Sequence, residues 1–119
     1  MKTILIIDDS QTVRNYHKSI VKAGGFRVVT AVDGADGLEK LYLNTVDMVL
    51  TDINMQGIDG YEFTRRVRSD ENFERLPIVM ISTEGEESDK LKGFEAGANL
   101  YMVKPAEPEF ILEQIRMFL

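Results

Sequence analysis

The chain has 119 residues, of which 44% are hydrophobic, and a formal net charge of −6. This length fits one compact domain, which we expect to span residues 1–119. The absence of cysteine excludes disulfides, thiolate metal sites and cysteine nucleophiles, and a single histidine excludes a histidine-rich metal site. The acidic balance argues against a general nucleic-acid binder, because binding to the phosphate backbone needs a surplus of Lys and Arg.

The N-terminal segment is too short for a signal peptide. Only five residues separate Lys2 from Asp8 and Asp9, and no apolar run in the chain approaches the length of a membrane span. We therefore expect a cytoplasmic protein that does not bind membranes.

The first half of the chain alternates apolar runs with helical patterns. The run 4–7 predicts a strand, and Ser10 is a suitable N-cap for a helix that ends before two glycines. The run 26–32 is interrupted by polar residues, which predicts an edge strand, and Asp33 introduces a second helix before the strand at 48–50. The apolar residues at helical spacing are Val13, Tyr16, Ile20, Val21, Leu38, Leu41 and Tyr42.

The second half continues the alternation. A helix is predicted over 60–69, a strand over 78–81, a helix over 86–96, a strand over 100–103 and a last helix from Pro108. The residues expected to face inward from these three helices are Phe63, Val67, Leu91, Phe94, Ile111, Leu112, Ile115 and Phe118. Continuous apolar runs are typical of strands that helices cover on both faces. The sequence therefore predicts an α/β fold with a doubly wound, five-stranded parallel sheet flanked by five helices.

Four of the predicted strands run directly into residues that carry chemistry. These residues are Asp8, Asp9, Thr51, Asp52, Ser82, Thr83, Lys104 and Pro105. In an open parallel sheet the carboxyl ends of the strands share one edge, and ligands bind in the crevice there. We therefore expect three carboxylates, a hydroxyl and an ammonium group to meet at this edge.

Three carboxylates a few ångströms apart repel one another by roughly 3 kcal/mol per pair at an effective dielectric of about 20. Lys104 supplies one compensating charge, and Mg²⁺, which binds carboxylates and bridges to phosphate oxygens, would supply two more. A carboxylate can attack phosphorus, and the transfer needs mainly in-line positioning and neutralisation of the equatorial oxygens. The lysine, the metal and the Ser82 hydroxyl are suited to that neutralisation.

The motifs together resemble the receiver domains of two-component response regulators. They are Asp8-Asp9, Asp52–Gly60, Ser82–Glu84 and Lys104-Pro105. Their order and spacing match from Lys2 to Phe118, and the general likeness is to single-domain receivers of the CheY type. The resemblance implies the flavodoxin-like strand order 2-1-3-4-5, for which CheY is itself a standard example.

The resemblance also implies a role for each acidic residue. Asp52 would be the phosphoacceptor. Asp9 and Asp52 would ligate Mg²⁺ (or Mn²⁺) directly, Asp8 would act on the metal mostly through water, and the backbone carbonyl of Asn54 would complete the metal shell.

The remaining site residues are assigned in the same way. Lys104 would pair with the phosphoryl group, and Ser82 would hydrogen-bond it after phosphorylation. Tyr101 matches an aromatic residue that turns inward as the serine moves, which would remodel the surface of the fourth helix, fifth strand and fifth helix. A tyrosine in an apolar run is equally consistent with core packing alone. Asn54 and Glu84 occupy positions that tune autodephosphorylation, and the Lys-Pro peptide is usually cis in this family.

Some features depart from the family pattern or receive a structural interpretation. Gln56 stands where proline is usual, and Ala106 stands where an aromatic is common. The fourth helix has an acidic start, which argues against flagellar-motor binding, although its acids also suit a helix N-terminus. His17 is predicted to lie on a helix surface away from the crevice.

The favoured hypothesis is a phosphorylation-controlled interaction module and not an enzyme. A histidine kinase or small phosphodonor would phosphorylate Asp52, and a target would bind the face of the fourth helix, fifth strand and fifth helix. We expect a monomer before phosphorylation, and overall similarity suggests chemotaxis as the pathway.

Four alternatives remain. A phosphatase with an aspartyl-phosphate intermediate would want a second acid where Asn54 stands, and a flavin or nucleotide site would suffer repulsion from Asp8 and Asp9. A receiver that docks without phosphorylation usually lacks an acid or the lysine, both of which are present here. The chain could also be the receiver of a longer regulator with a separate output domain.

Overall fold

The computed structural model describes all 119 residues. Five strands and five α-helices alternate along the chain, and a 3₁₀ helix precedes the fourth strand. In chain order the elements are β1 (Thr3–Ile7), α1 (Gln11–Ala23), β2 (Arg27–Ala31), α2 (Gly34–Leu43), β3 (Met48–Thr51), α3 (Gly60–Arg68), η1 (Glu71–Phe73), β4 (Ile78–Ser82), α4 (Glu87–Ala96), β5 (Leu100–Val103) and α5 (Pro108–Phe118).

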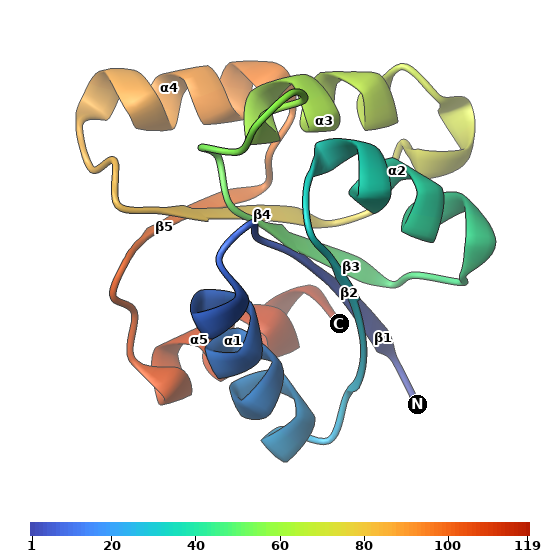
Figure 1. The fold of residues 1–119 in the computed structure, drawn as a ribbon, viewed down its shortest axis with the longest axis vertical. Coiled ribbons are helices and arrows are strands. Elements are labelled where there is room, and N and C mark those ends of the chain that lie inside the picture. The colour runs from blue at the N-terminus through green and yellow to red at the C-terminus, as the bar shows by residue number, and fades with distance from the viewer.

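All neighbouring strands pair in parallel, in the order β2-β1-β3-β4-β5. Helices α2, α3 and α4 cover one face of the sheet, and α1 and α5 cover the other (Figure 1). The predicted fold class and strand order are confirmed, and β2 is an edge strand as its interrupted apolar run indicates. The second edge is formed by β5.

The core lies on both faces of the sheet because successive side chains of a strand point to opposite sides. In β1, Ile4 and Ile6 pack with the buried residues of α1 and α5, whereas Leu5 and Ile7 pack with those of α2 and α3. A smaller cluster between the sheet, α3 and α4 contains Tyr61 and Tyr101. The continuous apolar runs in the sequence therefore have a direct physical cause.

The expectation that Leu91 and Phe94 face inward is wrong. Their exposed fractions are 58% and 47%. Helix α4 instead buries the small residues Gly93 and Ala96. A Cβ atom on Gly93 would lie 3.0 Å from the Tyr101 ring, so the helix backbone sits close to the sheet and the large apolar residues are left outside.

The helix ends follow the predicted signals. The Ser10 side chain accepts a hydrogen bond from the Val13 amide at 3.3 Å, and Gly97 ends α4 in the left-handed region with φ 116°. Pro108 occupies the first turn of α5. Of the helices, none is long and apolar enough to cross a membrane.

Helix α3 begins at Gly60, where its backbone lies very close to the residues that follow β3. A Cβ atom there would overlap the Asp52 carbonyl oxygen and would lie 2.8 Å from the Ile53 Cα atom. The Gly60 amide donates to the Ile53 carbonyl at 2.8 Å, which holds the helix start against this backbone.

We predict that Gly60→Ala lowers the free energy of unfolding by about 1–3 kcal/mol, because backbone must move to admit the methyl group. Gly85→Ala is the matched control, since a Cβ atom there meets only the Val103 side chain, at 3.5 Å. Urea unfolding of both variants checks the prediction. Equal stability of the two variants would contradict it.

Candidate functional site

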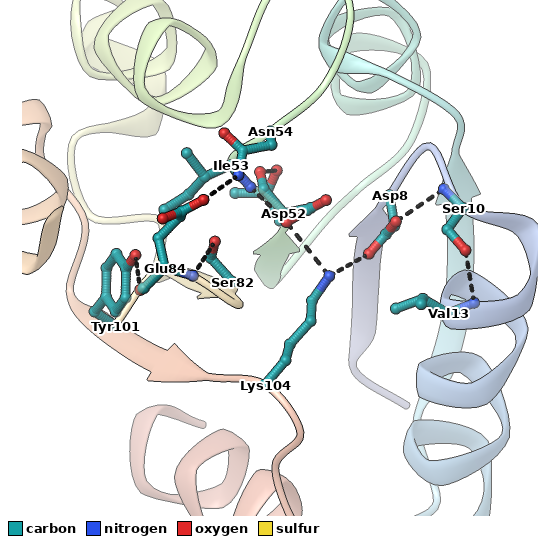
Figure 2. A network of polar contacts seen from close by, with 11 residues as sticks. Asp8, Ser10, Val13, Asp52, Ile53, Asn54, Ser82, Glu84, Tyr101 and Lys104 are labelled. Atoms are coloured by element: carbon teal, nitrogen blue, oxygen red, sulfur yellow. Dashed lines mark hydrogen bonds and ion pairs between the residues drawn. The ribbon is translucent and has the colours of Figure 1, made fainter. Parts of the chain in front are cut away.

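The carboxyl ends of four strands meet at one edge of the sheet, and backbone hydrogen bonds continue past the strands. The Asp52 amide donates to the Ile7 carbonyl at 2.9 Å, and the Lys104 amide donates to the Ser82 carbonyl at 2.8 Å. These bonds hold the first residues after β3 and β5 in line with the ends of β1 and β4. Figure 2 shows the resulting polar network, with Lys104 reaching toward both Asp8 and Asp52.

Three carboxylates converge as predicted. One ligand oxygen each from Asp8, Asp9 and Asp52 lie within 4.8 Å of one another. Asp8 and Asp52 are buried and Asp9 is exposed. Carboxylate oxygens at this spacing, with one side open to water, suit a hard divalent cation that keeps several waters in its shell. The residues present therefore fit a metal ion of the Mg²⁺ type.

Lys104 is the one ammonium group in this cluster. Its Nζ atom lies 3.0 Å from Asp8 Oδ2 and 3.3 Å from Asp52 Oδ1, and only 14% of its side chain is exposed. One positive charge thus faces three potential negative charges. The protein alone does not neutralise the cluster.

Burial raises the pKa of the Asp52 carboxyl above its usual value. Lys104 opposes the rise by attraction, the charge of Asp8 adds to it, and the Ile53 amide again opposes it through a hydrogen bond. The raised pKa means that Asp52 loses its proton less readily here than it would in water. A bound cation would reverse that tendency.

Backbone amides orient the two buried acids. Asp52 Oδ1 accepts a hydrogen bond from the Ile53 amide at 2.8 Å, and Asp8 Oδ1 accepts one from the Ser10 amide at 2.9 Å. The Arg14 guanidinium also donates to the backbone carbonyl of Asp8 at 2.7 Å. Both carboxylates are therefore held by contacts that do not depend on a ligand.

The β4–α4 loop connects Ser82 to Tyr101. Ser82 is fully buried, and its Oγ accepts a hydrogen bond from the Glu84 amide at 3.1 Å. The Glu84 carbonyl in turn accepts a hydrogen bond from the Tyr101 hydroxyl at 2.6 Å. The tyrosine ring is buried, as expected of a core residue. Its hydroxyl also contacts Glu84, a loop residue that is itself bonded to Ser82.

Asn54 and Glu84 meet beside the carboxylates. The Asn54 side-chain amide donates to Glu84 Oε1 at 3.2 Å, joining the loop after β3 to the loop after β4 (Figure 2). Both side chains are exposed. The predicted roles of the Asn54 carbonyl as a metal ligand, and of these two residues in dephosphorylation, stay predictions. The Lys104-Pro105 peptide is cis, as the family pattern implies.

The prediction for His17 is wrong. The residue is 3% exposed and lines a pocket of about 300 Å³ together with Tyr16, Lys104 and Pro105. Burial lowers the pKa of His17, and the nearby Lys104 lowers it further, so the imidazole is neutral beside the site. His17 lies three and four residues before Ile20 and Val21, so it shares the buried face of α1 with them. This spacing is the sequence signal that indicates its burial.

Tyr61 is a second residue that sequence reasoning missed. Its hydroxyl donates to the Asp89 carbonyl at 3.2 Å, burial raises its pKa to about 12, and the Lys92 ammonium lies 4.8 Å from the centre of its ring. Tyr61 thus contacts the first turn of α4, and Tyr101 contacts the loop before it, each through a backbone carbonyl. A tyrosine early in a helix carries no signal of such a contact.

Comparison with known proteins agrees with this geometry. The family model described as "Response regulator receiver domain" matches residues 4–116. The chain is 37% identical to the chemotaxis protein CheY1 of Helicobacter pylori, over 98% of this chain and 95% of that protein. It is 34% identical to the protein PilH of Pseudomonas aeruginosa, over 100% of this chain and 98% of that protein.

Solved structures show the same fold. The chemotaxis protein CheY4 of Vibrio cholerae superposes with a TM-score of 0.94 at 33% identity, covering 100% of this chain and 99% of that chain. A response regulator from Chloroflexus aurantiacus gives a TM-score of 0.94 at 37% identity, covering 98% of this chain and 96% of that chain. With the family model covering nearly its whole length, the chain belongs to the receiver domains of two-component response regulators.

Proposed function

We propose that the protein is a phosphorylation switch in which Asp52 accepts a phosphoryl group from a histidine kinase or a small phosphodonor. The observation that carries the proposal is the meeting of Asp8, Asp9, Asp52 and Lys104 at one sheet edge in a chain of the receiver family. The transfer forms a bond between an Asp52 carboxylate oxygen and phosphorus. The bond from phosphorus to the donor breaks, and the donor leaves with its electron pair.

The contacts of Asp52 favour one oxygen for this attack. Oδ1 already accepts a hydrogen bond from the Ile53 amide and lies beside Lys104, so Oδ2 is the atom available to phosphorus or to a metal. Lys104 would move from Asp52 to the incoming phosphoryl oxygens while its contact with Asp8 keeps the ammonium in place. Asp8, Asp9, Asp52 and the Asn54 carbonyl would hold Mg²⁺, which when bound neutralises charge on the phosphoryl oxygens.

The change at Asp52 would reach the surface through the β4–α4 loop. A phosphoryl group adds roughly −1.5 to −2 charges and strong acceptor oxygens. The Ser82 hydroxyl, whose oxygen accepts a hydrogen bond from the Glu84 amide, could donate its proton to one of them. Movement of Ser82 toward phosphate would disturb its contact with the Glu84 amide and hence the Glu84 carbonyl that holds Tyr101. We infer that phosphorylation shifts the population between two arrangements of α4, β5 and α5.

A protein of this kind is a switch and not an enzyme that turns over other substrates. Asn54, which stands where a haloacid-dehalogenase-type phosphatase has its second acid, is a side chain without a titratable proton and pairs with Glu84. Several relatives are chemotaxis proteins that match over nearly their full length, which supports a chemotaxis-like pathway in the cytoplasm. In such a pathway a histidine kinase would be the phosphodonor, and a target protein would bind the α4–β5–α5 face. The chain also matches about half of the transcriptional regulatory protein AfsQ1, so a place in a longer regulator is the alternative.

We predict that acetyl phosphate with Mg²⁺ adds one phosphoryl group to the protein, and that Asp52→Asn or EDTA abolishes the addition. Intact mass spectrometry checks both. Glu39→Gln, an exposed acid on α2, is the matched control and should behave as the wild type. An unchanged mass, or an addition that persists in Asp52→Asn, would rule out the proposal.

We predict that Lys104→Ala still accepts some phosphoryl group but no longer transmits it, because the ammonium that bridges Asp8 and Asp52 is lost. Amide spectra should show that the signals of Tyr101 and α4 shift on phosphorylation in the wild type and shift little in the variant. The exposed Lys22→Ala serves as control. Full spectral change in phosphorylated Lys104→Ala would refute the coupling.

We predict that Asp52→Asn raises the melting temperature in EDTA at pH 7. The folded pKa of Asp52 is raised, so its ionisation costs stability. This cost is absent below the ordinary pKa of about 4 and grows as the pH rises through the folded pKa. Thermal melts from pH 4 to 8 should therefore show a gap that opens with pH and narrows when Mg²⁺ is added. A gap that is constant with pH would contradict this origin.

A further inference from the structure

A pocket of about 300 Å³ lies between the first half of α1 and the segments that follow β4 and β5. Helix α1 contributes Val13, Tyr16 and His17, which share one side of the helix because they lie three and four residues apart. Thr83 and residues 104–106 complete the lining. Since an apolar cavity of about 150 Å³ can hold benzene, this pocket has room for a molecule of one or two rings.

The surface of the pocket is mainly apolar, and part of it consists of rings. The Tyr16 ring is 48% exposed, and the ring of Pro105 lines the pocket with it. Ala106 contributes only a methyl group, at a position where an aromatic residue is common in the family. A flat apolar molecule can stack on the tyrosine ring and use the space beside the small alanine.

The pocket offers no free charge to a ligand. Lys104 is the one lysine in the lining, and its ammonium is already bound by Asp8 at 3.0 Å and Asp52 at 3.3 Å (Figure 2). Neither acid lines the pocket itself. A charged ligand would lose its hydration here without gaining a free counter-charge, so the pocket favours a neutral molecule.

His17 is the buried polar group of the lining. Its exposed fraction is 3%, and burial and the charges of Lys104 and Asp8 act on its pKa without a hydrogen bond from any protein group. No completely enclosed side-chain nitrogen or oxygen in the protein lacks a hydrogen-bond partner, so the imidazole nitrogens without a partner keep some accessible surface. Because His17 lines the pocket, that surface faces the pocket.

The unpaired imidazole determines what a ligand should carry. Burial lowers the pKa of His17, so the ring is neutral at pH 7 and has one acceptor nitrogen and one N–H donor. A ligand that brings an N–H or O–H group into the pocket can donate to the acceptor nitrogen. A metal ion fits less well, because one imidazole without a carboxylate is a single ligand.

We propose that this pocket binds a small, neutral aromatic molecule of one or two rings that carries an N–H or O–H donor. The ligand's ring packs on Tyr16 and Pro105, and its donor is hydrogen-bonded to His17. The inference goes beyond the proposed function and does not rest on it, since binding here requires neither a metal ion nor a phosphoryl group.

Indole and indene test the proposal, because they have nearly the same size and shape but only indole has an N–H donor. Each is titrated into the isotope-labelled protein in EDTA at pH 7, and amide spectra measure the binding. We expect indole to bind with a dissociation constant of about 1 mM or less. Indene should bind about threefold more weakly or worse for lack of the hydrogen bond, and the anionic ring compound benzoate at least about tenfold more weakly than indole.

The position of the bound ligand is read from the same spectra. The amide signals of Tyr16, His17, Thr83 and Ala106 should shift with indole, whereas those of α2, which covers the other face of the sheet, should not. The nitrogen signals of the His17 imidazole should shift with indole and shift less with indene.

Two variants test separate parts of the proposal. His17→Phe keeps a ring but removes both nitrogens, so indole and indene should bind it equally within about twofold. Ala106→Phe puts a ring at a position that lines the pocket and should weaken indole binding at least about tenfold. Because an aromatic is common there in the family, we expect this variant to fold. Ala35→Phe, at an exposed position of α2, is the matched control and should change binding less than about twofold.

Four results would overturn the inference. They are no binding of indole, equal binding of indole and indene by the wild type, shifts centred away from the pocket, and equal effects of the two alanine substitutions. The first or second result would mean that His17 is hydrogen-bonded by water only. Thermal melts of each variant show whether it is folded, and the two alanine variants test the location independently of His17→Phe.

Discussion

The contact on which the site depends is the ammonium of Lys104 placed between Asp8 and Asp52. Without it, two buried carboxylates would repel each other in a place that water reaches poorly. With it, the cluster still carries more negative than positive charge, since Asp9 stands beside them. The remaining imbalance favours a cation at this site, and it is the basis of the metal binding and phosphorylation that we propose.

The sheet topology explains how residues from distant parts of the chain share this contact. The parallel order β2-β1-β3-β4-β5 brings the ends of β1 and β3 together at the centre and puts β5 at the rim. Lys104 spans the gap because its backbone amide is bonded to Ser82 while its side chain reaches inward. The small residues of α4 and of the start of α3 let both helices lie close to these strand ends. The geometry of the site is thus a property of the whole fold.

Much of this arrangement could be predicted from the sequence, because continuous apolar runs and the polar residues that follow them are local patterns. The strand order came from the resemblance to a family and not from the pattern. Leu91 and Phe94 were misplaced because hydrophobic spacing does not reveal that a glycine and an alanine set the distance between helix and sheet. His17 is buried on the same helix face as Ile20 and Val21, so its position on the helix, and not its polar residue type, indicates its burial. The hydroxyl contacts of Tyr61 and Tyr101 depend on tertiary structure alone.

Val103 and Lys104 are consecutive residues, yet one is exposed at the outer rim and the other is committed to the buried acids. The groups proposed for phosphorylation and the face proposed for the target are therefore adjacent in the chain but occupy separate surfaces. Substitutions at the rim can change that face while Lys104 keeps its contact with Asp8. Under the proposed function, duplicated copies of such a gene could acquire different targets and keep the same phosphorylation site, and an engineered copy could be redirected by the same means.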